Sequence, residues 1–396
     1  MQNGLNRIDG RIVIVGAGIG GLAAARALAL LGAKVTVLEQ APAITEVGAG
    51  IQLGPNGTAV MRALGLDQAL RDTGTPIGRA LVLRNRHGAR LARFPMSGLK
   101  RPDDYLFVHR ADLIKVLEQG ARAAGVTIDL GQRITGVRTG TPSDPMAVVE
   151  TDGKEITAPL VIGADGLHSV TARTLGDRGQ PFFTGQVAWR ATVPKDPSPT
   201  AEVELYMAPG RHLVTYPLRG GTLRNIVAVE ERSTWTEESW SRQDDPANLR
   251  AAFAQMGDRV QHLLARVETA HIWGLFRHPV AERWHGTGVA LMGDAVHPTL
   301  PFLAQGACMA LEDAWVLAAC LAGNSDQNLA LAGYQLRRHD RCRRIVDAAT
   351  RNAWAYHLSG PLALGAHTGM RVLGTLAPQK PIRSFAWLYD HDVTNA

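Results

Sequence analysis

Cysteine is scarce in this chain of 396 residues, which carries only Cys308, Cys320 and Cys342. These three form no CxxC pair, so the sequence argues against a zinc site and against the redox-active pair of disulfide reductases. An odd number of widely spaced cysteines also suggests no disulfide framework. We therefore expect neither a structural metal nor stabilising disulfides.

Long apolar runs are missing as well. No uninterrupted apolar stretch reaches the roughly 18 residues that a membrane-spanning helix needs. The first residues lack a charged segment followed by an apolar run, which a secretory signal would have. The sequence thus predicts a cytoplasmic protein without a membrane partner, as a monomer or homodimer.

A strong excess of one charge is also absent, since the formal net charge is only +6. This charge either favours an anionic cofactor and substrate or simply reflects surface composition. In the densest basic stretch, Arg337, Arg341 and Arg344 fall on one side of a predicted helix, which favours a solvated face. No aromatic residues interleave with them, so we expect no nucleic-acid partner.

The patterns that are present predict an α/β fold in several pieces. Apolar runs indicate a strand at 12–15, a helix at 22–31 and a strand at 34–38, which together form a βαβ unit with a parallel sheet. Short alternating segments follow near residues 80–94 and 187–229, typical of an antiparallel sheet. We predict a discontinuous Rossmann-type domain with an inserted antiparallel substrate domain and C-terminal helices. The expected boundaries are 1–75, 101–180 and 277–356 for the first domain, 76–100 and 181–276 for the second, and 357–396 for the C-terminal segment.

A glycine fingerprint lies between the first strand and the helix. Gly16, Gly18 and Gly21 satisfy GxGxxG, where the first glycine permits a tight turn, the second lets the backbone approach a pyrophosphate, and the third allows close packing. Glu39, at the end of the second strand, is placed to accept hydrogen bonds from ribose hydroxyls, and we assign the adjoining Gln40 to the same site. The fingerprint predicts a dinucleotide but does not separate FAD from NAD.

Three further motifs make that distinction. Residues 163–169 read GADGLHS, residues 293–298 read GDAVHP, and Gln305-Gly306-Ala307 is followed by LEDA at 311–314. In order and approximate spacing these segments resemble those of the single-component FAD-dependent aromatic monooxygenases. The resemblance covers residues 11 to about 356 and implies FAD as cofactor, with NADH or NADPH as a transient co-substrate. The presence of only one GxGxxG fits that implication.

Each motif also has a physical interpretation. Asp294 is expected to accept a hydrogen bond from the ribityl chain, and Pro298 to stiffen the turn beside the flavin. The helix starting at Gly306-Ala307 would aim its N–H groups at the pyrimidine edge, where negative charge develops on reduction. The resemblance adds Asp165 and Arg110 as positions that contact a nucleotide cofactor.

Within the family, the chain is similar to 3-hydroxybenzoate 6-hydroxylases, salicylate hydroxylases and 6-hydroxynicotinate 3-monooxygenases, on the segments 48–56 and 212–219. His212 and Tyr216 are four apart on a predicted strand, so their side chains point to one face. The resemblance places this pair in the substrate pocket. An imidazole is a suitable acceptor for the proton of a phenolic hydroxyl, and a tyrosine would orient the ring or its carboxylate.

The substrate itself stays open at this point. Gln52 matches the glutamine of the hydroxybenzoate hydroxylases where hydroxynicotinate enzymes carry histidine, and Val203 lies near a cysteine of the latter. Pro301, however, stands near a pocket glutamine of a hydroxybenzoate hydroxylase. We expect apolar pocket walls from Val187, Trp189, Pro301, Phe302 and Leu303.

The expected reaction is hydroxylation of a small hydroxylated aromatic carboxylate by O2 and NAD(P)H through a flavin C4a-hydroperoxide. The alternatives are a pyridinol hydroxylase of the 6-hydroxynicotinate type and a flavin-dependent reductase or oxidase on the same fold. A flavin-binding sensor without turnover is a more distant alternative.

Overall fold

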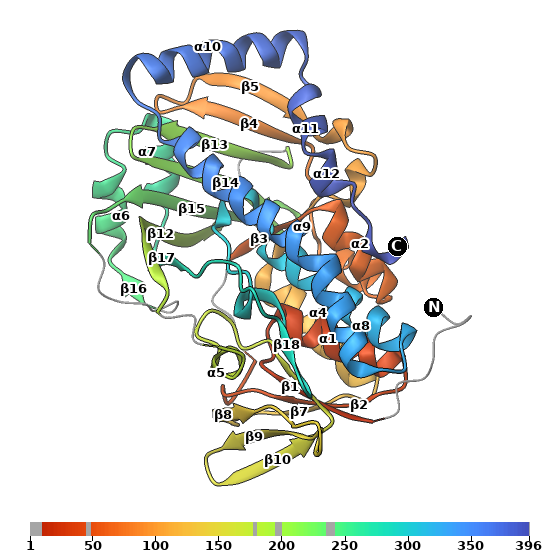
Figure 1. Cartoon of the computed structure of the whole chain (residues 1–396). Helices are drawn as coiled ribbons and strands as arrows, with labels where there is room; N and C mark the ends of the chain where they lie inside the picture. Colours follow the sequence, from red (N-terminus) through yellow and green to blue (C-terminus); the bar gives the residue numbers. More distant parts are fainter. Residues whose placement is uncertain (1–9, 45–48, 177–179, 195–199, 235–241, 396) are drawn as a thin grey trace.

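A computed structural model describes residues 10–44, 49–176, 180–194, 200–234 and 242–395, except the side chains of residues 353 and 354. A six-stranded sheet lies in the lower part of the molecule in Figure 1. Its strands lie in the order β18 (His285–Gly286), β19 (Val289–Leu291), β11 (Leu160–Gly163), β1 (Arg11–Val15), β2 (Lys34–Leu38) and β7 (Thr127–Asp129). All neighbours are parallel except β18 and β19, so most strands present their carboxyl ends at one edge.

Helices pack around this sheet. They are α1 (Ile19–Leu30), α2 (Pro55–Ala63), α3 (Asp67–Arg71), α4 (Arg110–Ala123), α5 (Val170–Arg173), α8 (Gly306–Gly323) and α9 (Gln327–Tyr356). Helix α1 is alanine- and leucine-rich and buried on nearly every side, as expected for a helix that packs between other elements. Helix α8 is long and apolar enough to span a membrane by length and composition, but it carries Glu312 and Asp313 and is mostly buried inside the protein.

The second layer is an eight-stranded sheet. Its order is β16 (Gln243–Asp244), β17 (Ala270–Arg277), β12 (Phe182–Pro194), β15 (Leu223–Glu231), β14 (Arg211–Leu218), β13 (Glu202–Ala208), β4 (Ala80–Asn85) and β5 (Arg90–Pro95). Neighbours are antiparallel except β13 and β4, whose parallel pairing joins two segments that are far apart in sequence. One face joins the main core, while the other packs under α6 (Pro246–Ala252) and α7 (Asp258–Ala265).

Two smaller sheets and the C-terminal segment complete the described structure. The strands β8 (Ile134–Arg138), β9 (Ala147–Thr151) and β10 (Lys154–Ala158) form one sheet, and β3 (Gly50–Leu53) pairs with β6 (Leu106–His109). Helices α10 (Gly360–Leu376), α11 (Lys380–Ser384) and α12 (Ala386–Tyr389) run from β5 back towards α2 (Figure 1).

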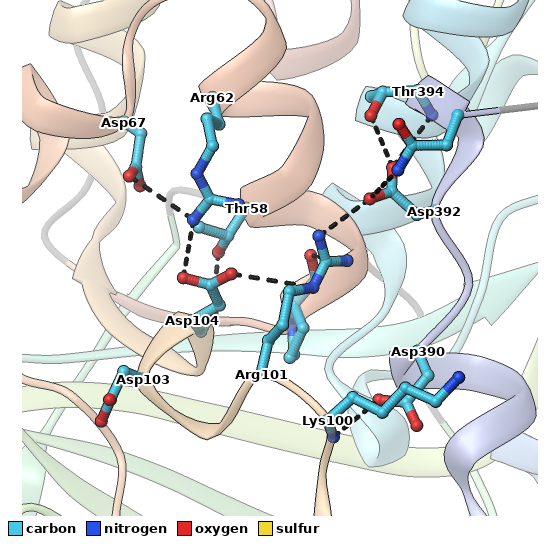
Figure 2. Close-up of polar contacts among 12 residues, drawn as sticks. Thr58, Arg62, Asp67, Lys100, Arg101, Asp103, Asp104, Asp390, Asp392 and Thr394 are labelled. Atoms are coloured by element: carbon cyan, nitrogen blue, oxygen red, sulfur yellow. Dashed lines mark hydrogen bonds and ion pairs between the residues drawn. The ribbon is translucent and has the colours of Figure 1, made fainter.

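The C-terminal segment is held by polar contacts that Figure 2 shows. Arg101 Nη1 donates to Asp392 Oδ2 at 2.8 Å, and the Lys100 backbone N–H donates to Asp390 Oδ1 at 3.1 Å. Asp104, on the same turn as Arg101, accepts from Arg62 of α2 at 2.7 Å. The last residues are thereby fixed to the turn that carries Lys100 and Arg101, which Asp104 connects to α2.

The predicted α/β class, with its parallel sheet, inserted antiparallel sheet and C-terminal helices, is confirmed. The predicted solvated arginine face is wrong for Arg341, whose guanidinium donates to Glu312 at 2.8 Å and is half-buried. Arg344 stacks on Trp387 at 3.8 Å. Arg337 is exposed, as predicted, whereas Arg341 and Arg344 contact α8 and the C-terminal segment, which the helical periodicity of α9 alone did not reveal.

Candidate active site

A cavity of about 650 Å³ lies between the two large sheets. The glycine loop after β1, the 293–307 segment and the core-side face of the eight-stranded sheet line it, together with residues of the C-terminal helices. Met370, Pro381, Ile382, Phe385 and Tyr389 supply this last wall. The C-terminal segment, whose role the sequence left undecided, therefore closes over the core.

The glycine loop has room for a phosphate. Gly16 adopts φ +101°, and a Cβ there would lie 2.5 Å from the Ala164 carbonyl oxygen. A Cβ on Gly21 would lie 2.0 Å from the Gly16 oxygen, so helix and turn pack too closely for a side chain. Gly18, the N-cap of α1, has no atom within 4 Å of that position. The helix N-terminus therefore faces open space where a pyrophosphate fits.

Glu39 lies beside this loop at the end of β2. Its Oε2 accepts from the Ala17 backbone N–H at 2.8 Å and its Oε1 from Ala41 at 2.9 Å. The carboxylate is thus oriented towards the first turn, at the position expected for a ribose contact. Gln40 follows it and is exposed, and its assignment to the cofactor stays a prediction.

Asp294 and Arg110 lie on the cofactor side of the cavity. Asp294 projects into it from a 3₁₀ turn after β19, so its carboxylate is accessible within the hollow although it lies deep in the protein. Burial raises the pKa of Asp294, and the charges of His297 and Arg110 oppose that shift. Pro298, Gly306 and Ala307 also line the cavity, and α8 begins at Gly306 without a side-chain cap on its N–H groups.

Asp165 is placed differently from the expectation. Its Oδ1 accepts from Ser169 Oγ at 2.6 Å, and its Oδ2 accepts from the backbone N–H and Oγ1 of Thr171, both at 3.0 Å. Its neighbours Gly166 and His168 line the cavity, whereas Asp165 does not. The carboxylate of Asp165 organises the turn before α5, and its assignment to the cofactor stays a prediction.

A buried ionic network, which sequence reasoning missed, supports the 293–307 segment from behind. Asp313 accepts from the Gly293 backbone N–H at 3.0 Å, from Arg338 Nε at 2.8 Å and from His297. Burial alone would lower the pKa of His297, but Asp313 raises it well above its usual value. Glu312 is held by Arg338 and Arg341, which bring its pKa down to about 2 against the effect of burial.

His212 and Tyr216 lie together on the cavity face of β14, as the four-residue spacing predicted. Burial, and then the repulsion that a protonated His357 would exert, hold the pKa of His212 well below its usual value, so the imidazole is neutral. The His212 ring packs edge-on against the rings of Phe302 and Tyr356, with distances of 5.1 and 5.3 Å between ring centroids. Burial raises the pKa of Tyr216, which keeps its hydroxyl protonated. The pair thus offers one neutral base and one hydrogen-bond donor.

Gln52, Pro301, Phe302 and Leu303 also line the cavity. Gln52 Oε1 accepts from Tyr105 Oη at 2.9 Å, which fixes the orientation of the amide on β3. Val203 lies in the opposite wall among aliphatic side chains. These residues make the substrate half of the cavity apolar apart from a few fixed polar groups.

Val187 and Trp189 are corrected from pocket walls to core residues. Both point to the other face of the eight-stranded sheet, where Trp189 packs edge-on against Phe253 and donates from Nε1 to Asp244 at 2.7 Å. The intervening position, Arg190, is the one that lines the cavity. Sequence reasoning missed it, although the alternation of strand residues contained the signal.

Arg190 brings a positive charge to the substrate half. Its guanidinium lies 4.0 Å over the ring of Trp273 on the neighbouring strand. Strand register aligns Trp273 with Ala188 of β12, Ala188 with Val229 of β15, and Val229 with His212. Since neighbouring strands lie roughly 5 Å apart, this row places Trp273 roughly 15 Å from His212 along the same face of the sheet.

Comparison with known proteins agrees with this geometry. Residues 9–349 match the family described as FAD binding domain. The chain is 36% identical to 3-amino-4-hydroxybenzoate 2-monooxygenase of Streptomyces cremeus, over 96% of this chain and 95% of that protein, and 32% identical to 3-hydroxybenzoate 6-hydroxylase of Polaromonas naphthalenivorans, over 98% of each. The structure of Klebsiella pneumoniae HpxO complexed with FAD and uric acid superposes with a TM-score of 0.84 at 26% identity, covering 98% of this chain and 99% of that one. The chain therefore belongs to the FAD-binding domain family and is one of its FAD-dependent aromatic monooxygenases.

Proposed function

We propose that this enzyme hydroxylates a small hydroxylated benzoate, of the 3-hydroxybenzoate or salicylate type, with NAD(P)H and O2. The observation that carries the proposal is the pairing of a neutral histidine with a stacked arginine across one apolar cavity. A phenolic acid has the two groups that such a pocket recognises, a hydroxyl and a carboxylate.

The cofactor residues have distinct tasks. We assign the pyrophosphate to the open space at Gly18, the ribose to Glu39, and the ribityl chain to Asp294 beside Arg110. Pro298, Gly306 and Ala307 would border the ring system. When bound, reduced FAD reacts with O2 and supplies an electrophilic oxygen atom.

The chain itself prepares the aromatic ring for that electrophile. Arg190 would hold the carboxylate by charge-assisted hydrogen bonds, with the ring against the aliphatic wall of β13 to β15. His212 would take the proton of the ring hydroxyl, which makes the ring a better nucleophile, and Tyr216 would donate to the resulting oxyanion or to the carboxylate. The buried walls and the C-terminal segment keep bulk water from this half of the cavity.

The test is NADH and NADPH oxidation by the FAD-loaded protein with each of four acids, followed by product mass. The acids are 3-hydroxybenzoate, salicylate, 3-amino-4-hydroxybenzoate and 6-hydroxynicotinate. We expect strong stimulation by a hydroxybenzoate and a product that contains one added oxygen atom from O2. If 6-hydroxynicotinate alone stimulates NAD(P)H oxidation, the pyridinol assignment replaces the benzoate one. If NAD(P)H is oxidised with all four acids but no product contains oxygen from O2, the hydroxylase proposal is refuted.

We also infer a cytoplasmic location for this enzyme. Cys308, Cys320 and Cys342 are all free thiols, as is usual in reducing compartments, and the co-substrate NAD(P)H is found there.

A further inference from the structure

A row of three ionisable side chains leads from the cavity to the molecular surface. His212 Nδ1 lies 2.7 Å from His357 Nε2, and His357 Nδ1 lies 2.6 Å from Glu231 Oε1. Both histidines are buried, whereas 53% of the Glu231 side chain is exposed. Glu231 opens on a surface hollow that it shares with Gln186 and Arg232. The three groups thus connect the interior cavity with solvent.

The hydrogen-bonding capacities of the three groups fix where the protons sit. An ionised carboxylate only accepts, so His357 donates to Glu231 from Nδ1. A neutral His357 then has Nε2 as its acceptor, and His212 must donate to it from Nδ1. His212 therefore presents Nε2 to the cavity as an unprotonated base. The tautomer required for proton removal from a substrate is set by a carboxylate two groups away.

The surrounding charges favour onward movement of a proton. Burial, and then the repulsion that a protonated His357 would exert, disfavour an imidazolium at His212, and its pKa is well below the usual value. Burial also lowers the pKa of His357, while Glu231 raises it and Arg211 lowers it. Tyr356, which packs on His212, is kept neutral because burial raises its pKa. A proton is therefore poorly held at His212 and better accommodated beside the carboxylate.

We propose that His357 and Glu231 form a relay that carries the hydroxyl proton of the bound substrate from His212 to solvent. The inference rests on the proposed function, because that function supplies the hydroxyl. The substrate O–H proton passes to Nε2 of His212 as the Nδ1 proton of His212 passes to Nε2 of His357. The Nδ1 proton of His357 then passes to Glu231 and to water. One proton leaves for each hydroxyl ionised, and no electrons change hands.

His357 and Glu231 are positioning residues in this scheme, since both act through His212. His357, which directly follows α9, also packs against the turn between β13 and β14. The Gly210 backbone N–H donates to the His357 carbonyl at 3.4 Å, and the Glu231 N–H donates to the Gly210 carbonyl at 2.9 Å. The relay is thus held by backbone contacts as well as by its own hydrogen bonds.

The experiment follows ionisation of a bound probe and does not require turnover. FAD-loaded protein is mixed with 3-hydroxy-4-nitrobenzoate, whose phenolate is coloured, and the appearance of phenolate is recorded by stopped-flow absorbance over a pH series. We compare the wild type with His357→Phe, which keeps a ring against His212, and with Glu231→Gln. Glu230→Gln is the matched control, because it removes a carboxylate from the adjacent position of β15 that pairs with Arg211 and Arg232 instead.

We expect His357→Phe and Glu231→Gln to slow ionisation by about tenfold or more and to shift its pH profile, with probe affinity within about twofold of the wild type. Glu230→Gln should keep the wild-type rate and profile. Ionisation at the wild-type rate in both relay variants would overturn the proposal, as would a wild-type cavity that binds the probe but leaves it protonated. Should His357→Phe fail to fold, the surface variant Glu231→Gln decides alone. A wild type that ionises the probe through His357 but hydroxylates no benzoate would retain the relay and refute the proposed function.

Discussion

Substitution of Arg190 by glutamine should selectively weaken binding of carboxylated phenols. Arg190 lies within the cavity, and its stacking on Trp273 holds the guanidinium in one orientation. A hydrogen bond to a charged group contributes about 1.5–3 kcal/mol, and the remaining cavity wall near it is largely aliphatic. The dissociation constant of 3-hydroxybenzoate should therefore rise roughly 10- to 150-fold, since about 1.4 kcal/mol corresponds to a factor of ten.

The assay is titration of the oxidised enzyme, monitored by the perturbation of the flavin spectrum. 3-Hydroxybenzamide serves as the neutral analogue of nearly the same shape, and its affinity should change by less than about threefold. Arg133→Gln removes a positive charge from an exposed position outside the cavity and controls for the general field of the protein. Equal losses for the acid and the amide would refute the reasoning, because the guanidinium would then be shaping the pocket without binding the carboxylate.

Three further predictions concern the base, the glycine loop and the buried network. His212→Gln should lower product formation by about 10²- to 10⁴-fold with little change in substrate affinity. Product formation is measured as oxygen incorporated per NADH consumed, and an unchanged ratio would exclude His212 as the base. Gly21→Ala should lower the free energy of unfolding by about 1–3 kcal/mol, because its Cβ meets the Gly16 oxygen, whereas Gly18→Ala should only weaken FAD binding. Urea unfolding measures the first effect and flavin fluorescence the second. A loss of stability in Gly18→Ala but not in Gly21→Ala would contradict the packing. The pKa of Glu312 is lowered in the fold from 4.5 to about 2, so its contribution of about 3 kcal/mol is complete above pH 4.5 and is lost as the pH falls towards 2. Urea unfolding across this range should show a shallower pH dependence in Glu312→Gln, and identical slopes would refute the assignment.

Local patterns predicted the elements that the cofactor site needs. The strand predicted at 12–15, the helix at 22–31 and the strand at 34–38 correspond to β1, α1 and β2, and they follow from periodicity and glycine spacing over fewer than thirty residues. These elements contact residues that are close to them in sequence, so a short stretch of sequence contains the information that predicts them.

Other features depend on contact partners that are distant in the sequence. The buried state of Arg338 depends on Glu312 and Asp313 of another helix, and periodicity alone favoured exposure of its neighbours. Likewise, the role of His357 depends on Glu231, which lies 126 residues away. Strand alternation, in contrast, contained the signal for Arg190, but the apolar side chains at 187 and 189 favoured the opposite face of β12 as the pocket wall.

The wall that the C-terminal helices add to the cavity has a consequence for biosynthesis. The phosphate loop at Gly18 leaves the ribosome before Phe385 and Tyr389, which lie more than 360 residues further along the chain. At roughly 5–20 residues per second, tens of seconds separate the two events. The nascent chain therefore exposes its nucleotide loop long before the pocket can close, and a complete active site cannot assemble until the C-terminal helices have been synthesised.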